Sequence, residues 1–200
     1  MHLTLDGVCH WFAPGCNLFA RLDGELTPGC LYGVVGPSGA GKTTLLSLLA
    51  GVEAPKEGRI ARDGIASVQW VQQIPHGVAR RSVLDHVALP LIAAGATRVA
   101  AEHEAVELLA WFNLVHQVDA QYCTLSGGEA QRLMLARGVA AQPDLLLVDE
   151  PTALLDRNAA AEVNAVLGSV CGPDRIVVVA TKDPQTQEMC GELIDIGWAT

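Results

Sequence analysis

The stretch from Gly36 to Thr44 constrains this chain more than any other. It reads Gly-Pro-Ser-Gly-Ala-Gly-Lys-Thr-Thr and matches the pattern G-x-x-x-x-G-K-[ST], in which a glycine-rich loop cradles phosphate groups. Glycines let the backbone adopt positive φ and come close to phosphate oxygens, so that consecutive N–H groups converge on the β-phosphate. A strand-like apolar run at 31–35 precedes the loop, and a largely apolar run at 45–50 follows it. The stretch therefore predicts a bound nucleoside triphosphate.

The residues after the loop are expected to form a helix over 42–50. Its N-terminal N–H groups and positive dipole end would then face the phosphates. Lys42 would reach the β- and γ-phosphates, and the Thr43 hydroxyl would bind Mg²⁺, a hard cation that takes few protein ligands. Through this loop we expect the nucleotide to be bound by Gly36, Pro37, Ser38, Gly39, Ala40, Gly41, Lys42, Thr43 and Thr44.

Length and composition favour one nucleotide-binding core with room for a small inserted subdomain, because the chain has 200 residues and 50% of them are hydrophobic. The formal net charge is −9 and the basic residues cluster only at Arg80-Arg81, which argues against nucleic acid as a partner. No apolar stretch reaches the roughly 20 residues that cross a bilayer, and the first residues lack an export signal. The six cysteines show no metal-binding spacing, so we expect reduced thiols in a cytoplasmic protein.

The first part of the chain is predicted to contribute strands and turns. Short β-like runs at 3–5, 8–12 and 18–22 alternate with turns at 6–7, 13–15 and 23–24, which favours a small antiparallel sheet. Beyond the loop helix, turns at 54–58 and 62–64 enclose a short strand at 59–61, and a further strand is expected at 65–71.

The rest of the chain is predicted to alternate helices with buried strands. Helical spacing places Ala105, Val106, Leu108, Leu109 and Phe112 on one face, and we expect an inserted helical subdomain over about 82–126. Ser126 and Glu129 fit a capping box at the start of a helix that runs to about 141. Apolar runs at 145–148 and 176–180 are typical of parallel strands buried on both faces, with a helix at about 159–170 between them.

Polar residues stand at three strand ends. The phosphate loop follows one strand, Asp149-Glu150 ends another, and Thr181-Lys182-Asp183 ends the third. Ligands in open α/β sheets collect at the carboxyl ends of the parallel strands. Two acids at the end of a buried strand are costly unless a cation lies nearby. The pattern therefore predicts one site shared by the three strand ends.

Two further motifs make the whole chain resemble an ATP-binding cassette (ABC) ATPase. They are Leu125-Ser126-Gly127-Gly128-Glu129 and the run from Leu145 to Glu150 followed by Pro151-Thr152. The resemblance implies an α/β fold in one domain, 1–200: a P-loop NTPase core with a mostly parallel sheet, a small N-terminal antiparallel β subdomain and an inserted α-helical subdomain. It also implies that two cassettes pair head to tail around two ATP molecules. Ser126 and Gly128 would then meet the γ-phosphate bound by the partner subunit, with an anion-ready helix end behind them.

The resemblance also assigns the acids at the second strand end. Asp149 would hold Mg²⁺ through water, and Glu150 would be the general base that orients and deprotonates the attacking water. Lys42 would act with these two acids in catalysis, because its positive charge neutralises phosphate charge. Phosphoryl transfer needs mainly positioning and charge neutralisation.

Other assignments from the resemblance leave a choice between neighbours. Gln73 takes the place of a family glutamine that touches Mg²⁺ and senses the membrane partner, with Gln72 as the competing choice. Phe12, or its neighbour Trp11, would stack on the adenine ring. Asp156 matches an acid that reaches across the dimer.

Three departures from the family pattern bear on activity. The segment 58–73 is shorter than is usual in the family, so the antiparallel subdomain is expected to be reduced. Leu154 stands where the family usually has a small or polar residue. Lys182 occupies the position of the family's switch histidine, and although its fixed charge can contact the γ-phosphate, it lacks the hydrogen-bond geometry of an imidazole. We therefore expect slow hydrolysis.

The resemblance favours a cytoplasmic ATPase subunit of an ABC transporter, peripheral on the inner face of the cell membrane. It would form a homodimer, or a heterodimer with another ABC ATPase subunit, and drive separate integral membrane permease subunits. Residues 83–91 are similar to the lipoprotein-releasing and macrolide-exporting branch. The alternative is a non-transport ABC protein, either a soluble assembly ATPase or an ATP-gated binding module in which Lys182 has stopped turnover.

Overall fold

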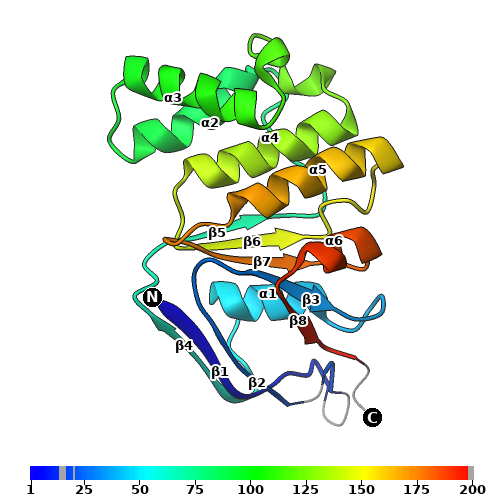
Figure 1. The fold of residues 1–200 in the computed structure, drawn as a ribbon. Helices are drawn as coiled ribbons and strands as arrows, with labels where there is room; N and C mark the ends of the chain where they lie inside the picture. The colour runs from blue at the N-terminus through cyan, green and yellow to red at the C-terminus, as the bar shows by residue number, and fades with distance from the viewer. Residues whose placement is uncertain (14–16, 20, 198–200) are drawn as a thin grey trace.

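The computed structural model describes residues 1–13, 17–19 and 21–197, and its strands form two sheets (Figure 1). The parallel sheet has the order β5-β6-β7-β3-β8, made of Val68–Val71, Leu145–Asp149, Ile176–Ala180, Leu31–Val35 and Glu192–Asp195. The antiparallel sheet has the order β2-β1-β4, made of Leu22–Leu26, His2–Cys9 and Glu57–Asp63.

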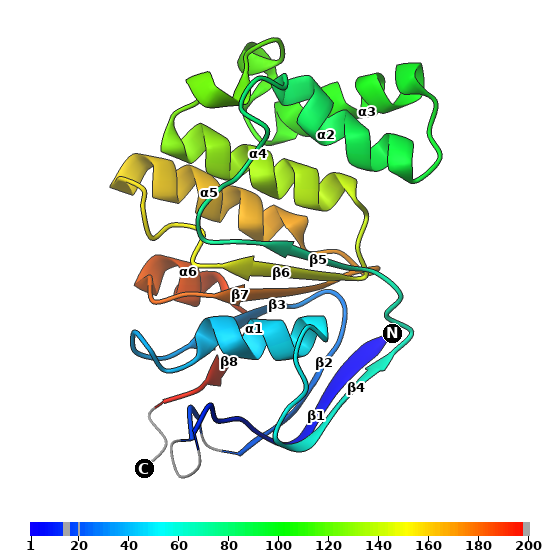
Figure 2. The same cartoon turned by 180° about the vertical axis from the view of Figure 1, so that it is seen from behind.

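Helices cover both faces of the parallel sheet. They are α1 (Lys42–Ala50), α2 (Val83–Ala93), α3 (Arg98–Trp111), α4 (Gly127–Ala140), α5 (Arg157–Val170) and α6 (Pro184–Met189), with 3-10 turns η1 (Val115–Gln117) and η2 (Tyr122–Thr124). Helices α4 and α5 lie along one face, and α2 and α3 lie beyond them, whereas α1 lies on the other face, on the side of the antiparallel sheet (Figures 1 and 2). Every helix in the described part of the chain is too short or too polar to cross a membrane.

The alternation of side chains along β6 divides the core in two. Leu145 and Leu147 belong to the cluster that contains the leucines of α1, whereas Leu146 and Val148 belong to the cluster that contains α4 and α5. All four are fully buried, because successive strand residues point to opposite faces and both faces are covered here. The continuous apolar run thus anchors the strand that ends in Asp149.

The predicted fold class is confirmed, with a parallel sheet, a small antiparallel sheet and helices. The bounds of α1 and β7 are those predicted, and helices lie within 82–126. The helix predicted at about 159–170 begins earlier, at Arg157. Helix α6 and strand β8 were not predicted.

The predicted turns at 6–7 and 23–24 are wrong, because both lie inside strands. Gly7, with φ of 60°, instead forms an irregularity at which the register of β1 shifts, so the strand continues to Cys9. The run 8–12 leaves the strand after Cys9, and of the run 18–22 only Leu22 is in a strand among the described residues. Part of the predicted turn at 13–15 lies outside the described residues.

Two other predicted bounds and one predicted helix face need correction. Strand β4 spans 57–63 and so includes parts of both predicted turns, because its full length pairs with β1. Strand β5 begins only at Val68. In α3 the buried stripe is Ala101, Ala105 and Leu109, whereas Val106 is 38% exposed, because α3 packs on its neighbours along one narrow face.

Candidate functional site

The N-terminus of α1 is open. Gly41 is its N-cap residue, with φ of 98°, and no side chain caps the helix. The other α-helices in the described part of the chain each have a side-chain cap, from Ser82, Thr97, Ser126, Asp156 and Asp183. The first amides of α1 are therefore free to receive an anion, and Gly39, with φ of 84°, lets the loop backbone wrap around it.

Lys42 lies folded back under the phosphate loop. Its ammonium donates hydrogen bonds to the carbonyls of Gly36 at 3.0 Å and Pro37 at 3.2 Å. It also lies 3.3 Å from Oε1 of Glu150, and both side chains are largely buried. The cation needed beside the acids at the end of β6 is thus the lysine of the loop.

Thr43 and Asp149 join the loop to the end of β6. The Thr43 hydroxyl donates to Oδ2 of Asp149 at 2.8 Å, while Oδ1 of Asp149 is buried and has no partner among the described residues. Burial is the main cause that raises the pKa of Asp149, and the charge of Glu150 adds to it, against the Thr43 hydrogen bond and the charge of Lys42. A hydroxyl beside a carboxylate with an unused oxygen fits the oxygen ligands that Mg²⁺ prefers.

Glu150 sits in a strained turn directly after β6. Its φ is 41°, which is uncommon for a residue with a side chain, and its N–H donates to the carbonyl of Ala180 at 2.8 Å. The N–H of Lys182 donates to Oε2 of Glu150 at 3.2 Å. The end of β7 therefore holds Glu150 twice, at its N–H through Ala180 and at its carboxylate through the N–H of Lys182.

These groups border a cavity of about 300 Å³. It is lined by Phe12, Leu18, Ser38, Gly39, Gly41, Lys42, Thr43, Thr44, Gln73, Glu150 and Lys182. Of the loop residues expected to bind nucleotide, Gly36, Pro37 and Ala40 do not line it: the first two hold Lys42, and Ala40 is buried in the core. Asp149 reaches the cavity through Thr43.

The lining of this cavity decides between Gln72 and Gln73, and between Trp11 and Phe12. Gln73 lines it, whereas Gln72 lines a different pocket beside Met134 and Arg137. Phe12 lines it too and is 70% exposed, so it is not a core aromatic, and its ring forms a T-shaped pair with that of His10, with centroids 5.3 Å apart. Trp11 is not among the lining residues.

Ser126 and Gly128 lie apart from this cavity. They line another, of about 510 Å³, together with Glu129, Arg132, Asp156, Arg157, Asn158, Ala159 and Glu162. The predicted capping box is present: Ser126 Oγ accepts from the N–H of Glu129, and Glu129 accepts from the N–H of Ser126 at 2.8 Å. The hydroxyl and N–H of Ser126, with Gln117 and His116, lower the pKa of Glu129 to about 2 despite partial burial.

Asp156 has a local role in the structure. Its Oδ1 accepts from the N–H groups of Asn158 at 2.9 Å and Ala159 at 3.0 Å, which caps α5. Sequence reasoning placed the start of α5 two residues late because it did not take Asp156 as a helix cap.

The comparisons with known proteins agree with this geometry. A family model described as ABC transporter matches residues 19–153. The chain belongs to the ABC transporter family of ATP-binding proteins. The match covers the phosphate loop, the Ser126 cap and the acids at the end of β6, so the family resemblance read from these motifs is confirmed.

Relatives within the ABC family differ in how much of their length is matched. The chain is 39% identical over 201 residues to the lipoprotein-releasing system ATP-binding protein LolD of Granulibacter bethesdensis, covering 91% of this chain and 88% of that protein. It is 35% identical to the uncharacterized ABC transporter ATP-binding protein Mb2593 of Mycobacterium bovis, where the match covers 97% of this chain but only 64% of the relative.

Solved structures of ABC proteins share the fold. A chain of an ABC transporter in an inward-facing conformation superposes with a TM-score of 0.83 at 27% identity, covering 97% of this chain and 79% of that chain. The ATP-binding cassette MJ0796, a dimer bound to ADP and Pi, gives a TM-score of 0.84 at 23% identity, covering 99% and 97%. At 23% identity, the similarity to MJ0796 supports the fold alone.

Sequence reasoning missed some residues around the site. Leu18 lines the cavity beside Phe12, but an apolar residue in an irregular segment carries no signal of its own. Asp183 caps α6 and accepts from Asn164 and Thr186. Asp183 followed by Pro184 is a typical start of a helix, with an acid at the cap and a proline at the first helical position, and this pair could have predicted α6 from the sequence.

Proposed function

We propose that this chain binds and hydrolyses MgATP as the cytoplasmic ATP-binding subunit of an ABC transporter. The observation that carries the proposal is the meeting of three strand ends at one cavity. Thr43 and Asp149 offer oxygen ligands there, and Lys42 and Glu150 lie beside them 3.3 Å apart. The open N-terminus of α1 supplies donors for the phosphates.

Each group has a role that its position supports. Lys42 and the α1 amides offset the charge of the β- and γ-phosphates. Thr43, Asp149 through water, and Gln73 are the residues that would hold Mg²⁺, which when bound neutralises phosphate charge. Glu150 orients and deprotonates the attacking water, and the hydrogen bonds from the end of β7 to its backbone and its carboxylate limit its motion. Phe12, exposed at the cavity edge, offers a ring face for adenine.

The position of the Ser126 cavity supports a dimer. Ser126 and Gly128 do not line the cavity of the phosphate loop, so within one chain they do not reach the same nucleotide. A second copy or a related subunit, placed head to tail, would bring this second helix N-terminus to the γ-phosphate. We place a separate membrane permease as the further partner, with the subunit on the inner face of the cell membrane; the relatives are named as ATP-binding proteins of an ABC transporter and of a lipoprotein-releasing system.

A specific observation favours a second candidate. Lys182 lines the nucleotide cavity and stands beside Glu150 in place of the family's switch histidine. An ammonium has donors and no acceptor, so it can strengthen ATP binding without helping the base. The alternative function is therefore an ATP-gated binding module, or another non-transport ABC protein, with slow or arrested turnover.

Glu150→Gln tests the proposal. The variant should keep its affinity for MgATP, lose about a thousandfold in turnover, and elute as a dimer in gel filtration with MgATP, because the base is removed while the cation site is spared. Glu25→Gln, an exposed change on β2, is the matched control and should behave as wild type. A monomeric Glu150→Gln protein with undiminished turnover would remove Glu150 from the mechanism.

A further inference from the structure

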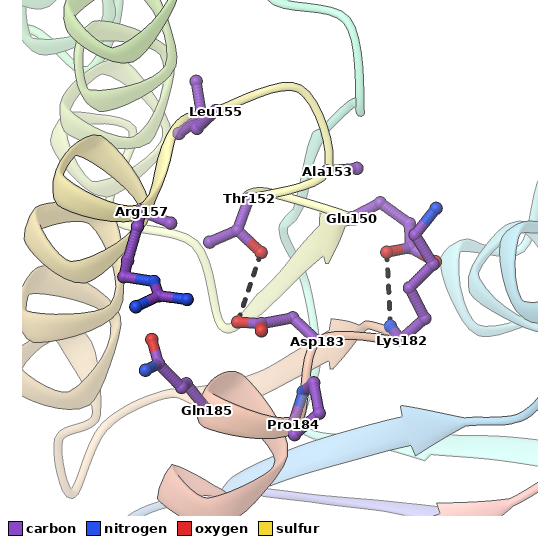
Figure 3. Close-up of a pocket in the computed structure, with 10 residues that line it drawn as sticks. Glu150, Thr152, Ala153, Leu155, Arg157, Lys182, Asp183, Pro184 and Gln185 are labelled. Carbon is purple, nitrogen blue, oxygen red and sulfur yellow. Dashed lines mark hydrogen bonds between the residues drawn. The ribbon is translucent and has the colours of Figure 1, made fainter.

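A further cavity also borders Glu150. It measures about 590 Å³ and is lined by Glu150, Thr152, Ala153, Leu155, Arg157, Ala160, Lys182, Asp183, Pro184 and Gln185 (Figure 3). Glu150 and Lys182 line both this cavity and that of the phosphate loop. This cavity of about 590 Å³ is called the rear cavity below. It borders Glu150, the residue proposed to act on the attacking water.

The carboxylates of the rear cavity are already satisfied. Glu150 pairs with Lys42 and accepts from the N–H of Lys182. Oδ2 of Asp183 accepts from Thr186 Oγ1 at 2.7 Å, from Asn164 at 3.3 Å and from Thr152 at 3.5 Å. Although burial acts to raise it, these Thr186 and Asn164 hydrogen bonds lower the pKa of Asp183.

The cations of the rear cavity, Arg157 and Lys182, are exposed to solvent and form no ion pair among the described residues. Within the described part of the chain, no carboxylate lies within 4.0 Å of the side-chain nitrogens of Arg157 or Lys182. Asp156, next to Arg157 in the chain, uses its carboxylate to cap α5. Figure 3 shows the guanidinium of Arg157 directed toward Asp183 and Gln185. The rear cavity thus offers two cations without ion-pair partners in the described structure, beside an Asp183 carboxylate that is held by neutral hydrogen-bond donors.

We propose that the rear cavity binds inorganic phosphate, and that phosphate formed at the phosphate loop passes Glu150 and is held there by Arg157 and Lys182 before it leaves. The proposal rests on the proposed ATPase function for the source of the phosphate. A guanidinium donates two parallel hydrogen bonds to phosphate oxygens, and an ammonium adds a point charge, which matches the two free cations. No covalent step is involved, since cleavage precedes the transfer.

A binding experiment tests the cavity without turnover. Protein saturated with a non-hydrolysable analogue of MgATP, so that both the β- and the γ-phosphate positions of the loop are filled, is titrated with inorganic phosphate and followed by phosphorus NMR line width. We expect Arg157→Gln to weaken phosphate binding about tenfold and Arg157→Lys to retain part of the affinity, because one bidentate contact is lost or replaced. Arg59→Gln, an exposed arginine on β4, is the control and should match wild type. Equal affinities in wild type and Arg157→Gln would overturn the proposal.

A kinetic experiment tests the route. In a single turnover, cleavage is read by chemical quench and release by a fluorescent phosphate sensor. We expect Arg157→Gln to shorten the delay between cleavage and release, measured against the cleavage time of the same protein, and an unchanged delay would overturn the route. A slower cleavage step would instead place Arg157 in the reaction itself and overturn the proposal. If the protein hydrolyses no ATP, the proposed function fails, and the phosphate titration still decides whether the rear cavity binds phosphate.

Discussion

The ammonium of Lys42 and the carboxylate of Glu150 lie 3.3 Å apart, with 7% and 11% of their side chains exposed. The pair joins the start of α1 to the end of β6. Two charges withdrawn from water in this way are stable only because each compensates the other and both make further hydrogen bonds. The residue expected to bind phosphate and the residue expected to activate water are therefore coupled before any phosphate binds.

Lys42→Ala should abolish measurable MgATP binding, a loss of about a hundredfold or more, because the ammonium offsets phosphate repulsion at close range. Isothermal titration with MgATP measures the effect. Lys56→Ala removes an exposed lysine and serves as the control. An affinity that is the same in Lys42→Ala and wild type would contradict the role of the loop lysine.

Asp149→Asn should raise the stability of the nucleotide-free protein while removing the Mg²⁺ dependence of ATP binding. Because burial raises its pKa, the ionised form of Asp149 opposes folding, and this cost is present above the folded-state pKa and disappears as the pH falls below it. We expect the substitution to add about 1 kcal/mol at pH 7.5, or roughly 2–4 °C in Tm. The extra stability of Asp149→Asn over wild type should become smaller as the pH falls toward 4.

Thermal unfolding across pH and titration with and without Mg²⁺ measure both effects of Asp149→Asn. Asp119→Asn, an exposed change near η1, is the control for the loss of one charge. A variant that is less stable than wild type at every pH would show that the carboxylate of Asp149 stabilises the fold without a metal.

Local patterns predicted the parts of this fold that depend on nearby residues. Helix α1 and strand β7 have the predicted bounds, and the Ser126 cap has the predicted partners, because each depends on residues within a few positions. The site followed from one topological rule, that parallel strands end at the same edge.

Features set by distant contacts escaped prediction. Gln72 and Gln73 are equivalent in sequence, and only the path of the chain after β5 places the second in the nucleotide cavity. Strand β1 continues through Gly7 because β2 and β4 pair with it on both sides. The ion pair of Lys42 with Glu150 was not foreseen, because it joins two elements far apart in sequence.

His86 fastens the segment after Gln73 to α2. Its ring is buried, donates from Nδ1 to the carbonyl of Ser82 at 2.7 Å and accepts at Nε2 from the N–H of Val78 at 2.9 Å. Tyr122 lies against the ring and donates to the carbonyl of Pro75 at 2.7 Å. A protonated imidazole has no acceptor, so protonation breaks the contact with Val78.

Protonation of His86 should therefore destabilise the protein. Burial chiefly lowers its pKa, with Arg81 and Arg137 acting in the same direction and Ser82 and Asp85 against it. The stabilising contribution of the neutral ring is full above pH 6.5 and is lost as the pH falls below it, by up to about 1 kcal/mol per pH unit. In thermal unfolding between pH 7.5 and 5.5, His86→Gln should lose less stability than wild type. His103→Gln, whose side chain is 79% exposed, is the control, and an equal pH dependence in all three proteins would contradict this account.

Lys182 stands at the end of β7, where its side chain lines both the nucleotide cavity and the rear cavity. Its backbone N–H holds Glu150, but its ammonium makes no ion pair with that residue in the described structure. The charge is nevertheless close to the proposed base, and we expect it to stabilise bound ATP in the ground state as well as in the transition state.

Lys182→His should raise steady-state ATPase activity about tenfold, which corresponds to roughly 1.4 kcal/mol of activation free energy. A neutral imidazole removes a cation that opposes proton transfer to Glu150, and it keeps one donor for the γ-phosphate while adding an acceptor. Lys182→Ala removes the charge without supplying the imidazole and should not give this gain, so the pair of variants separates the two effects. Phosphate production measured with and without a membrane partner provides the rates. Equal rates in wild type and both variants would show that Lys182 acts on neither the γ-phosphate nor Glu150, because a cation within the reacting group's reach cannot be exchanged without a change in rate.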